Sequence, residues 1–281
     1  MLVLPSLLAV AAVALFPLFQ TFRLSFTNTR LGSARESNYV GFDNYERLFG
    51  DPQFIRSIWH TLIFTFSSVA LETTLGMIVA LTIHSYFRGR GLVRASILVP
   101  WAIPTVVSAL MWDWMFHDRF GIINDMLTRL RLQDSGSNFA WTANTDTSLL
   151  AIIAVDVWKT TPFMALLLLA GLQIIPGDVY EASYVDGASK WQQFWQITLP
   201  LLRPALLVAL IFRTLDAFRV FDVIYVMKGY APDTMSIAVY TQQALLNNFR
   251  VGYGSAAAVI IFLIIGVLVM IYTRLIRVEE T

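Results

Sequence analysis

Six long apolar stretches run through the sequence and restrict the chain to a helical membrane fold. A helix needs about 20 mostly apolar residues to cross the hydrocarbon core of a bilayer. Because hydrocarbon satisfies no backbone N–H or C=O group, each spanning segment must make those hydrogen bonds within itself, as a helix does. We therefore predict an all-α integral membrane protein with a single transmembrane domain, residues 1–281. The six predicted transmembrane helices cover approximately residues 2–22, 57–83, 96–116, 148–175, 205–227 and 253–273.

Individual stretches carry further signals. The first stretch also has the length of a secretory signal peptide, but no basic residue precedes it and no small-residue cleavage site follows it. We therefore predict a transmembrane helix there. Pro104 and Pro162 lie within the third and fourth stretches and are expected to kink both helices. Residues 117–147 are polar, and we predict an exterior loop there with one short amphipathic helix at 120–132.

The composition excludes several classes of function. Only 14% of the residues are charged, whereas about a quarter are charged in soluble proteins, and the net charge of +1 does not indicate a nucleic-acid partner. The absence of cysteine excludes disulfides, thiolate metal sites and cysteine nucleophiles. There is also no G-x-S-x-G motif and no His/Glu cluster. We predict neither a metal site nor an enzyme.

The positions of the lysines show whether the chain contains a phosphate-binding loop for ATP. The sequence contains only Lys159, Lys190 and Lys228, and none of them follows a glycine. The phosphate-binding loop G-x-x-x-x-G-K-[ST] is therefore absent. We predict that the chain binds no cofactor itself, and that any ATP driving it is bound by another subunit.

A polar stretch between the fourth and fifth apolar stretches, residues 181–204, reads EASYVDGASKWQQFWQITLPLLRP. Pro176-Gly177 precedes it and is expected to end the fourth transmembrane helix. Asp178, followed by Glu181, has the spacing of a capping box that starts a new helix. The side chains of Tyr180 and Tyr184 are expected on exposed faces of this helix.

The rest of the stretch predicts a turn and a second short helix. Asp186-Gly187 allows a sharp turn, because glycine tolerates positive φ. A helix from Trp191 to Thr198 should follow. Leu199-Pro200 should end that helix, because a proline pushes the preceding residue out of helical geometry.

The order of residues in this stretch resembles the coupling loop, or EAA loop, of permease subunits in binding-protein-dependent ABC importers. YVGFDNYERLF and the segments beside the loop are similar to the carbohydrate-importer branch of that family. The resemblance implies the type I ABC importer permease fold, with a cytoplasmic coupling-helix loop at 176–204 that docks on an ATPase subunit. It assigns this coupling to Glu181, Ala182, Tyr184, Asp186, Gly187, Ala188, Phe194, Leu199 and Pro200.

The same resemblance implies a function and a set of partners. The chain would be a non-catalytic permease subunit of an ATP-driven importer for a di- or oligosaccharide or a small glycoside. It would pair with a second homologous permease, two subunits that bind ATP and Mg²⁺, and an extracytoplasmic sugar-binding protein. Glycerol-phosphate importers share the fold and stay open as relatives. The alternative is an ion-coupled secondary transporter, which usually shows inverted repeats and broken helices.

The resemblance also orients the chain in a prokaryotic cell membrane. A cytoplasmic coupling loop and an even number of spans place both termini in the cytoplasm. Basic residues are nevertheless more numerous in the loops assigned to the other side, although they usually mark cytoplasmic loops. We orient the chain by the coupling loop.

Ionisable residues inside the predicted spans form a second candidate site, because charges in a membrane are costly and often functional. In RTLDAFRVFD, basic and acidic residues alternate at three-residue steps, so that neighbours can pair along the helix. Two interpretations stay open: ion pairs between helices, or the lining of a polar cavity that binds sugar hydroxyls. Glu72 stands alone in its span as a packing or cavity group. The candidate substrate path consists of Trp112, Asp156, Trp158, Lys159, Thr160, Arg213, Asp216, Arg219 and Asp222.

Two further details belong to these candidates. Four aromatic residues can stack on sugar faces: Trp112, Trp114, Trp158 and Phe163. An interfacial aromatic belt explains the isolated tryptophans equally well. After the fifth stretch, KGYAPDTMS occupies the place of a Gly-Gly-Pro-type loop that reaches the binding protein in sugar permeases, and it lacks the second glycine. The resemblance assigns this contact to Lys228, Gly229, Tyr230 and Pro232.

Overall fold

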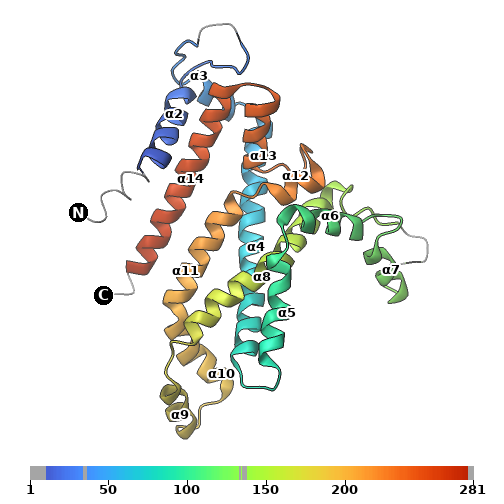
Figure 1. Ribbon diagram of the computed structural model, residues 1–281, viewed down its shortest axis with the longest axis vertical. Coiled ribbons are helices and arrows are strands. Elements are labelled where there is room, and N and C mark those ends of the chain that lie inside the picture. Colours follow the sequence, from blue (N-terminus) through green and yellow to red (C-terminus); the bar gives the residue numbers. More distant parts are fainter. Residues whose placement is uncertain (1–10, 34–36, 133, 135–137, 278–281) are drawn as a thin grey trace. The chain divides into compact units, whose positions relative to one another are not determined.

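The computed structural model describes residues 11–33, 37–132, 134 and 138–277 (Figure 1). Within these residues the regular elements are helices, and a single β-bridge joins Thr27 and Tyr39. The chain divides into two compact units. Unit 1 comprises Met1–Thr61 and Lys228–Leu268, and unit 2 comprises Leu62–Met227 and Val269–Thr281.

Among the described residues, four helical segments are long and apolar enough to cross a membrane, which confirms the all-α membrane fold. They are α4 (Pro52–His84), α8 (Thr145–Leu172), the stretch Lys190–Lys228 and α14, which spans Val251–Arg277. A bent helix pair at residues 90–115 supplies up to one more span. The predicted total of six remains a prediction.

The first predicted span lies partly outside the described residues. Its described part consists of the π-helical turn η1 (Ala11–Leu15) and α2 (Phe16–Ser25). Phe16 and Phe19 are exposed on the surface of α2, as expected for side chains that face lipid.

The third predicted span is broken, not merely kinked. α5 (Arg90–Ala102) and α6 (Thr105–Met115) meet at 90°. Ile103 and Pro104 between them have extended backbone, with ψ of 133° and 139°. Proline disfavours helical geometry in the residue before it, so Ile103-Pro104 ends α5 and a new helix begins at Thr105.

The fifth predicted span continues directly from the second helix of the predicted coupling loop, which corrects the predicted stop at Leu199-Pro200. α10 (Lys190–Gln193), the π-helical turn η2 (Phe194–Thr198) and α11 (Leu199–Phe218) follow one another without a break. Pro200 occupies the first turn of α11, where a proline is tolerated. The chain leaves the helix later, at Arg219 (φ −98°, ψ 19°), before α12 (Asp222–Lys228) begins.

Glycines bring the helices of unit 2 into close contact around α8. A Cβ on Gly171 would lie 2.4 Å from Ala205 Cβ on α11, and one on Gly76 would lie 2.7 Å from Met164 Cγ. Small residues let helix backbones approach in this way. Apolar side chains of α4, α8 and α11 fill the resulting core: Met77, Ala80, Ile83, Met164, Leu168, Leu169, Leu172, Leu202 and Ala209.

In unit 1, the segment that follows α2 packs against the first turn of α14. The amide of Gly252 donates to Thr29 O at 3.0 Å, and a Cβ on Gly252 would lie only 1.9 Å from Thr27 O. The elements of this unit also include α3 (Asp43–Phe49), α13 (Ile237–Gln242) and η3, which spans Gln243–Asn247. The hydroxyl of Tyr240 donates to Asp51 at 2.6 Å, and burial together with this bond raises the pKa of Tyr240.

Candidate functional site

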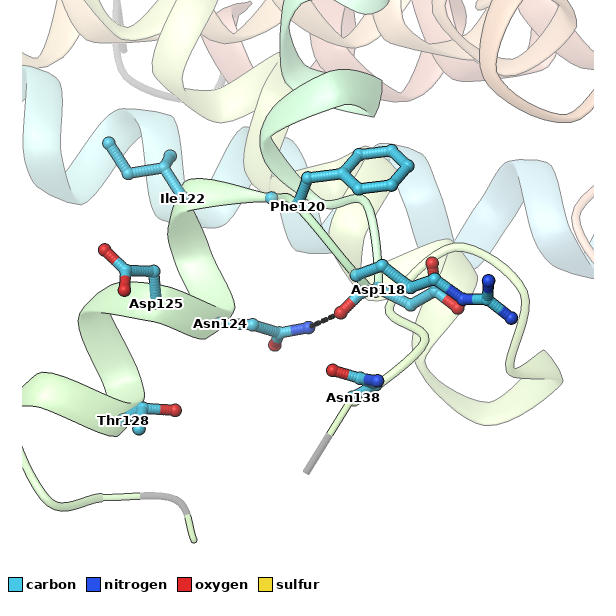
Figure 2. A pocket seen from close by; sticks show the side chains of 9 residues that line it. Asp118, Phe120, Ile122, Asn124, Asp125, Thr128 and Asn138 are labelled. Carbon is cyan, nitrogen blue, oxygen red and sulfur yellow. Dashed lines mark hydrogen bonds between the residues drawn. The ribbon is translucent and has the colours of Figure 1, made fainter. Parts of the chain in front are cut away.

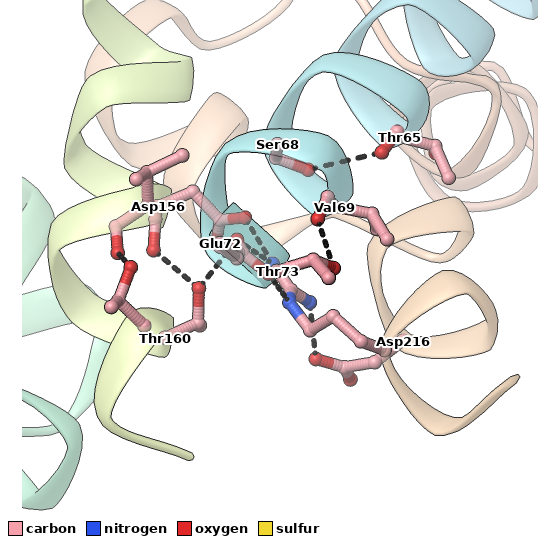
Figure 3. Close-up of polar contacts among 11 residues, drawn as sticks. Thr65, Ser68, Val69, Glu72, Thr73, Asp156, Thr160 and Asp216 are labelled. Carbon is pink, nitrogen blue, oxygen red and sulfur yellow. Dashed lines mark hydrogen bonds and ion pairs between the residues drawn. The ribbon is translucent and has the colours of Figure 1, made fainter. Parts of the chain in front are cut away.

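A charge cluster in unit 2 brings together Glu72, Asp156 and Asp216 (Figure 3). It is centred on Arg213 of α11, which is only 2% exposed. Its guanidinium donates to both carboxylate oxygens of Glu72 from α4 and to the carboxylate of Asp156 from α8. Nη1 also donates to Asp216 Oδ2 at 2.8 Å. Buried charges are tolerated when they are paired and hydrogen-bonded, and the planar fork of arginine suits carboxylates well.

Thr160 completes the charge cluster, which we define as Glu72, Asp156, Thr160, Arg213 and Asp216. Its hydroxyl lies 2.6 Å from Glu72 Oε1 and 2.5 Å from the backbone oxygen of Asp156. Glu72 is fully buried and was expected as a lone group, yet it is a principal partner of Arg213. The sequence contained one signal for this partnership: a carboxylate in an apolar span needs a counter-ion, so the charge of Glu72 indicates a basic partner on another helix.

The predicted pairing along the fifth span is correct for one pair and wrong for the next. Arg213 pairs with Asp216 three residues on. Arg219 and Asp222 form no ion pair among the described residues, because the helix ends at Phe218 and the three-residue spacing no longer brings them together.

The charge cluster borders a cavity of about 200 Å³. The side chain of Asp216 is 69% exposed and forms the accessible edge of the cluster. Seven residues of the predicted substrate path lie together in the wall: Asp156, Lys159, Thr160, Arg213, Asp216, Arg219 and Asp222.

The aromatic residues of the cavity differ from those predicted. Trp112 and Trp158 pack edge to face on each other, with ring centroids 5.4 Å apart, and neither lines the cavity. Trp101 lines it instead, and its ring stacks on Phe163 at 5.7 Å and 12°. The sequence missed Trp101 because only the break at Ile103-Pro104 brings the end of α5 to this wall.

The cavity wall combines three kinds of contact that a polar, uncharged ligand needs. Carboxylates accept hydrogen bonds, the ammonium of Lys159 and the guanidinium of Arg219 donate them, and the face of Trp101 offers apolar area. Sugars present both hydroxyls and apolar C–H faces, so such a wall can bind them by hydrogen bonding and stacking.

The coupling hairpin, residues 176–204, forms a second candidate site at one end of α8 and α11 (Figure 1). The predicted turn is confirmed: α9 (Gly177–Val185) leads into Gly187, which has a φ of +79°. The predicted capping box at Asp178 is wrong. Pro176 is the N-cap of α9, which places Asp178 inside the first turn, and Ser189 with Gln192 forms the capping box of α10 instead.

Two side-chain hydrogen bonds hold the hairpin together. Tyr180 bonds to Thr198 at 3.0 Å, and Gln193 donates to Ser183 at 2.9 Å. Tyr180 is therefore half-buried, not exposed as predicted, whereas Tyr184 is 79% exposed as predicted.

The residues predicted for coupling fall into two groups. One group is exposed at the tip: Glu181, Ala182, Tyr184, Asp186 and Gly187. Ala188 is partly exposed beside it. The other group lies at the base of the hairpin. Phe194 and Leu199 pack on the core of unit 2, and Pro200, the next residue in the chain, is half-buried.

Two loops complete the set of predicted features. α7 (Ile122–Arg129) confirms the short helix predicted in the loop after α6, and an open cavity of about 560 Å³ lies beside it (Figure 2). There Asn124 donates to the backbone oxygens of Asp118 and Phe139 at 2.9 and 3.0 Å, and accepts from Trp141 at 2.8 Å. This hydrogen bonding shapes the loop.

The loop at 228–236 is fixed within unit 1. Lys228 forms an ion pair with Asp233 at 3.2 Å, and the hydroxyl of Tyr230 donates to Gln242 at 2.7 Å. Gln53 donates to Pro232 O at 3.2 Å, and Gly229 has a φ of +60°. Gly229, the one glycine that this loop keeps from the Gly-Gly-Pro-type pattern, therefore has a left-handed backbone conformation that favours glycine.

Comparison with known proteins gives a family and several relatives. The family described as "Binding-protein-dependent transport system inner membrane component" matches residues 72–277. The chain is 41% identical to the trehalose/maltose transport system permease protein MalF of Thermococcus litoralis, over 98% of this chain and 92% of that protein. It is 36% identical to the sulfoquinovosyl glycerol transport system permease protein SmoG of Agrobacterium fabrum, over 100% of this chain and 90% of that protein.

Solved structures share the fold. A crystal structure of a bacterial ABC transporter involved in the import of the acidic polysaccharide alginate matches with a TM-score of 0.84 and 23% identity. The match covers 98% of this chain and 93% of that chain. The bacterial alginate ABC transporter in complex with alginate pentasaccharide-bound periplasmic protein matches 96% of this chain and 91% of its own, with a TM-score of 0.83 and 24% identity.

Proposed function

Because the chain belongs to the family of binding-protein-dependent transport system inner membrane components, we propose that it is the membrane-spanning permease subunit of an ATP-driven importer for a di- or oligosaccharide or a small glycoside. The shared fold confirms the predicted type I ABC importer permease architecture. The assignment of a sugar or glycoside as the transported substrate rests on one observation. Over nearly its whole length the chain is similar to permeases named for trehalose, maltose and a glycosyl glycerol. An ion-coupled secondary transporter has no support from these relatives.

The energy comes from partner subunits in this proposal. The chain has no phosphate-binding loop, so two ATPase subunits bind ATP and Mg²⁺ and the chain itself catalyses nothing. A second homologous permease and an extracytoplasmic sugar-binding protein complete the importer. A related alginate transporter is known in complex with a periplasmic protein, which supports the last partner.

The coupling hairpin receives the movement of the ATPase subunits. Its exposed tip carries Tyr184, which can fill a groove on a partner, as buried aromatic anchors do in protein interfaces. Its base is continuous with α11 through η2, so a displacement of the tip is transmitted to a membrane helix without a flexible joint. This role places the hairpin and both termini in the cytoplasm, and the loop at 228–236 on the outer side, facing the binding protein.

The cavity beside the charge cluster lies on the sugar path. Asp216, Lys159 and Arg219 offer hydrogen bonds to hydroxyls, and Trp101 offers a stacking face. The buried part of the cluster, Glu72 with Arg213 and Asp156, holds α4, α8 and α11 in register. The two interpretations of the intramembrane charges therefore apply to different members of one cluster.

Uptake by the reconstituted importer tests the proposal. Radiolabelled trehalose and maltose should enter vesicles that contain the chain, its second permease, its ATPase subunits and its binding protein. Uptake should stop when the ATPase subunits carry an inactivating substitution, while the ion gradients stay intact. Uptake that persists with inactive ATPase and stops when the ion gradient collapses would reject the importer assignment. Binding of a panel of sugars and of glycerol phosphate to the binding protein should also be measured. This measurement shows whether the assigned substrate is wrong, independently of whether the ATP-driven mechanism is wrong.

A further inference from the structure

Three arginines from three separate segments line one small cavity in unit 1. Arg30 follows α2, Arg47 belongs to α3, and Arg250 directly precedes α14. The cavity has a volume of about 40 Å³, and Asn28 and Thr29 contribute to its wall. This is room for roughly three water-sized groups, which suits the oxygens of one tetrahedral anion and is too little for a sugar.

Backbone contacts fix the arginines relative to one another. The amide of Leu31 donates to Phe249 O at 2.9 Å, and the amide of Gly252 donates to Thr29 O at 3.0 Å. These two bonds flank Arg30 and Arg250. The side-chain amide of Asn44 donates to the backbone oxygens of residues 25 and 27, each at 2.8 Å, and so ties α3, which carries Arg47, to the same segment.

Three arginines line this cavity and, among the described residues, no carboxylate lines it; the carboxylate of Asp51 lies behind the wall, 3.5 Å from the hydroxyl of Tyr253. Arg47 pairs with Asp43 at 2.7 Å, but both side chains are largely exposed, so solvent weakens that pair. The guanidinium of Arg250 lies 4.9 Å from the ring centre of Tyr253. Among the described residues, neither Arg30 nor Arg250 forms an ion pair. Like charges held together repel one another, and a bound anion would relieve that repulsion.

The cavity lies at the ends of two helices, α2 and α14, that expose large apolar side chains. α2 ends at Ser25 and α14 begins at Val251, and the two helices touch through Phe22 and Phe262, with ring centroids 5.8 Å apart. Large apolar side chains along both helices are exposed, as surfaces that face lipid are: Phe16 and Phe19 on α2, and Phe262 and Leu263 on α14. In the predicted topology, in which both helices cross the bilayer, the arginines stand at the level of the lipid headgroups, directly above acyl-chain surface.

We propose that Arg30, Arg47 and Arg250 form a phosphate-binding site, and that the headgroup of an anionic phospholipid supplies the phosphate. Arginine binds phosphate oxygens in bidentate fashion, while the apolar surfaces of α2 and α14 accept the acyl chains. The site is independent of the sugar cargo, so its failure leaves the proposed function untouched.

Native mass spectrometry of the full chain, purified in detergent with its partner subunits, tests the site. Phosphatidylglycerol, phosphatidylcholine and inorganic phosphate are each added to the wild type, to an Arg30→Gln/Arg250→Gln variant and to Arg56→Gln. Arg56 is the matched control, because it is an exposed arginine of unit 1 at the start of α4 that does not line the cavity. Arg30 and Arg56 are exposed and Arg250 is partly exposed, and substitutions at such surface positions usually have little effect on folding.

We expect the double variant to lose phosphatidylglycerol affinity by about tenfold or more, since charged hydrogen bonds are strong. Arg56→Gln should bind like the wild type, and phosphatidylcholine should not distinguish the three proteins. Arg250→Lys should give an intermediate loss, because lysine keeps the charge without the fork. Binding of inorganic phosphate without phosphatidylglycerol would keep the phosphate site and overturn the lipid source. Equal phosphatidylglycerol binding by all variants would overturn the proposal.

Discussion

The coupling hairpin and the charge cluster are built in opposite ways. The hairpin is held by bonds within one short segment, such as that between Tyr180 and Thr198, which are 18 residues apart, and it leaves its tip exposed. The cluster joins groups that are far apart in sequence: Arg213 lies 57 residues from Asp156 and 141 from Glu72. A local, exposed element can bind a moving partner without unfolding its surroundings. A buried, non-local element fixes the membrane helices against which that movement acts.

The largest effect is expected from Arg213→Met. This change leaves the carboxylates of Glu72 and Asp156 buried without a counter-ion, which should cost about 3–5 kcal/mol. The variant should show a much lower midpoint of thermal unfolding in detergent. Combining it with Glu72→Gln and Asp156→Asn removes the stranded charges and should recover part of the loss. If Arg213→Met alone unfolds like the wild type, the cluster does not hold the helices together.

The same contrast explains what the sequence could and could not predict. The turn at Gly187 follows from a local pattern, and the structure confirms it. The partnership of Glu72 with Arg213 depends on how three helices pack, and no periodicity within one helix specifies that. Trp101 was missed for the same reason, since its place depends on the break after α5. The wrong stop at Pro200 was a local error: a proline in the first turn of a helix looks the same in sequence as one that ends a helix.

The next effect tests the hairpin. Gly187→Val forces a β-branched side chain to a φ of +79°, although no atom would obstruct its Cβ. The strain of about 1–3 kcal/mol should distort the turn and leave the buried helices unchanged. We expect normal membrane insertion and a midpoint of thermal unfolding like that of the Gly89→Val control, but weaker stimulation of ATP hydrolysis by the loaded binding protein. Gly89→Val is the matched control, because Gly89 also has a positive φ (+86°) and open space, and it lies outside the hairpin. Full stimulation in Gly187→Val would contradict a coupling role for the hairpin turn.

A smaller effect is expected at the cavity wall. Trp101→Ala removes the stacking face from the proposed sugar path, which should cost about 0.5–1.5 kcal/mol of binding. The KM of sugar uptake should rise several-fold, with little change in the unfolding midpoint. Trp114→Ala provides the control, because Trp114 is exposed and does not line the cavity. An equal rise in KM for both variants would show that loss of any tryptophan in this region has the same result.

The smallest effect on stability is expected from Asp216→Asn, and it separates the two roles within the charge cluster. Asp216 contacts the same guanidinium as Glu72 and Asp156, but its side chain is 69% exposed. Solvent already screens this pair, so its loss should cost less than about 1 kcal/mol. Glu72 and Asp156 still neutralise Arg213 in this variant. The unfolding midpoint should therefore stay near that of the wild type while sugar uptake changes. A drop in stability as large as that of Arg213→Met would mean that Asp216 belongs to the buried framework and not to the sugar path.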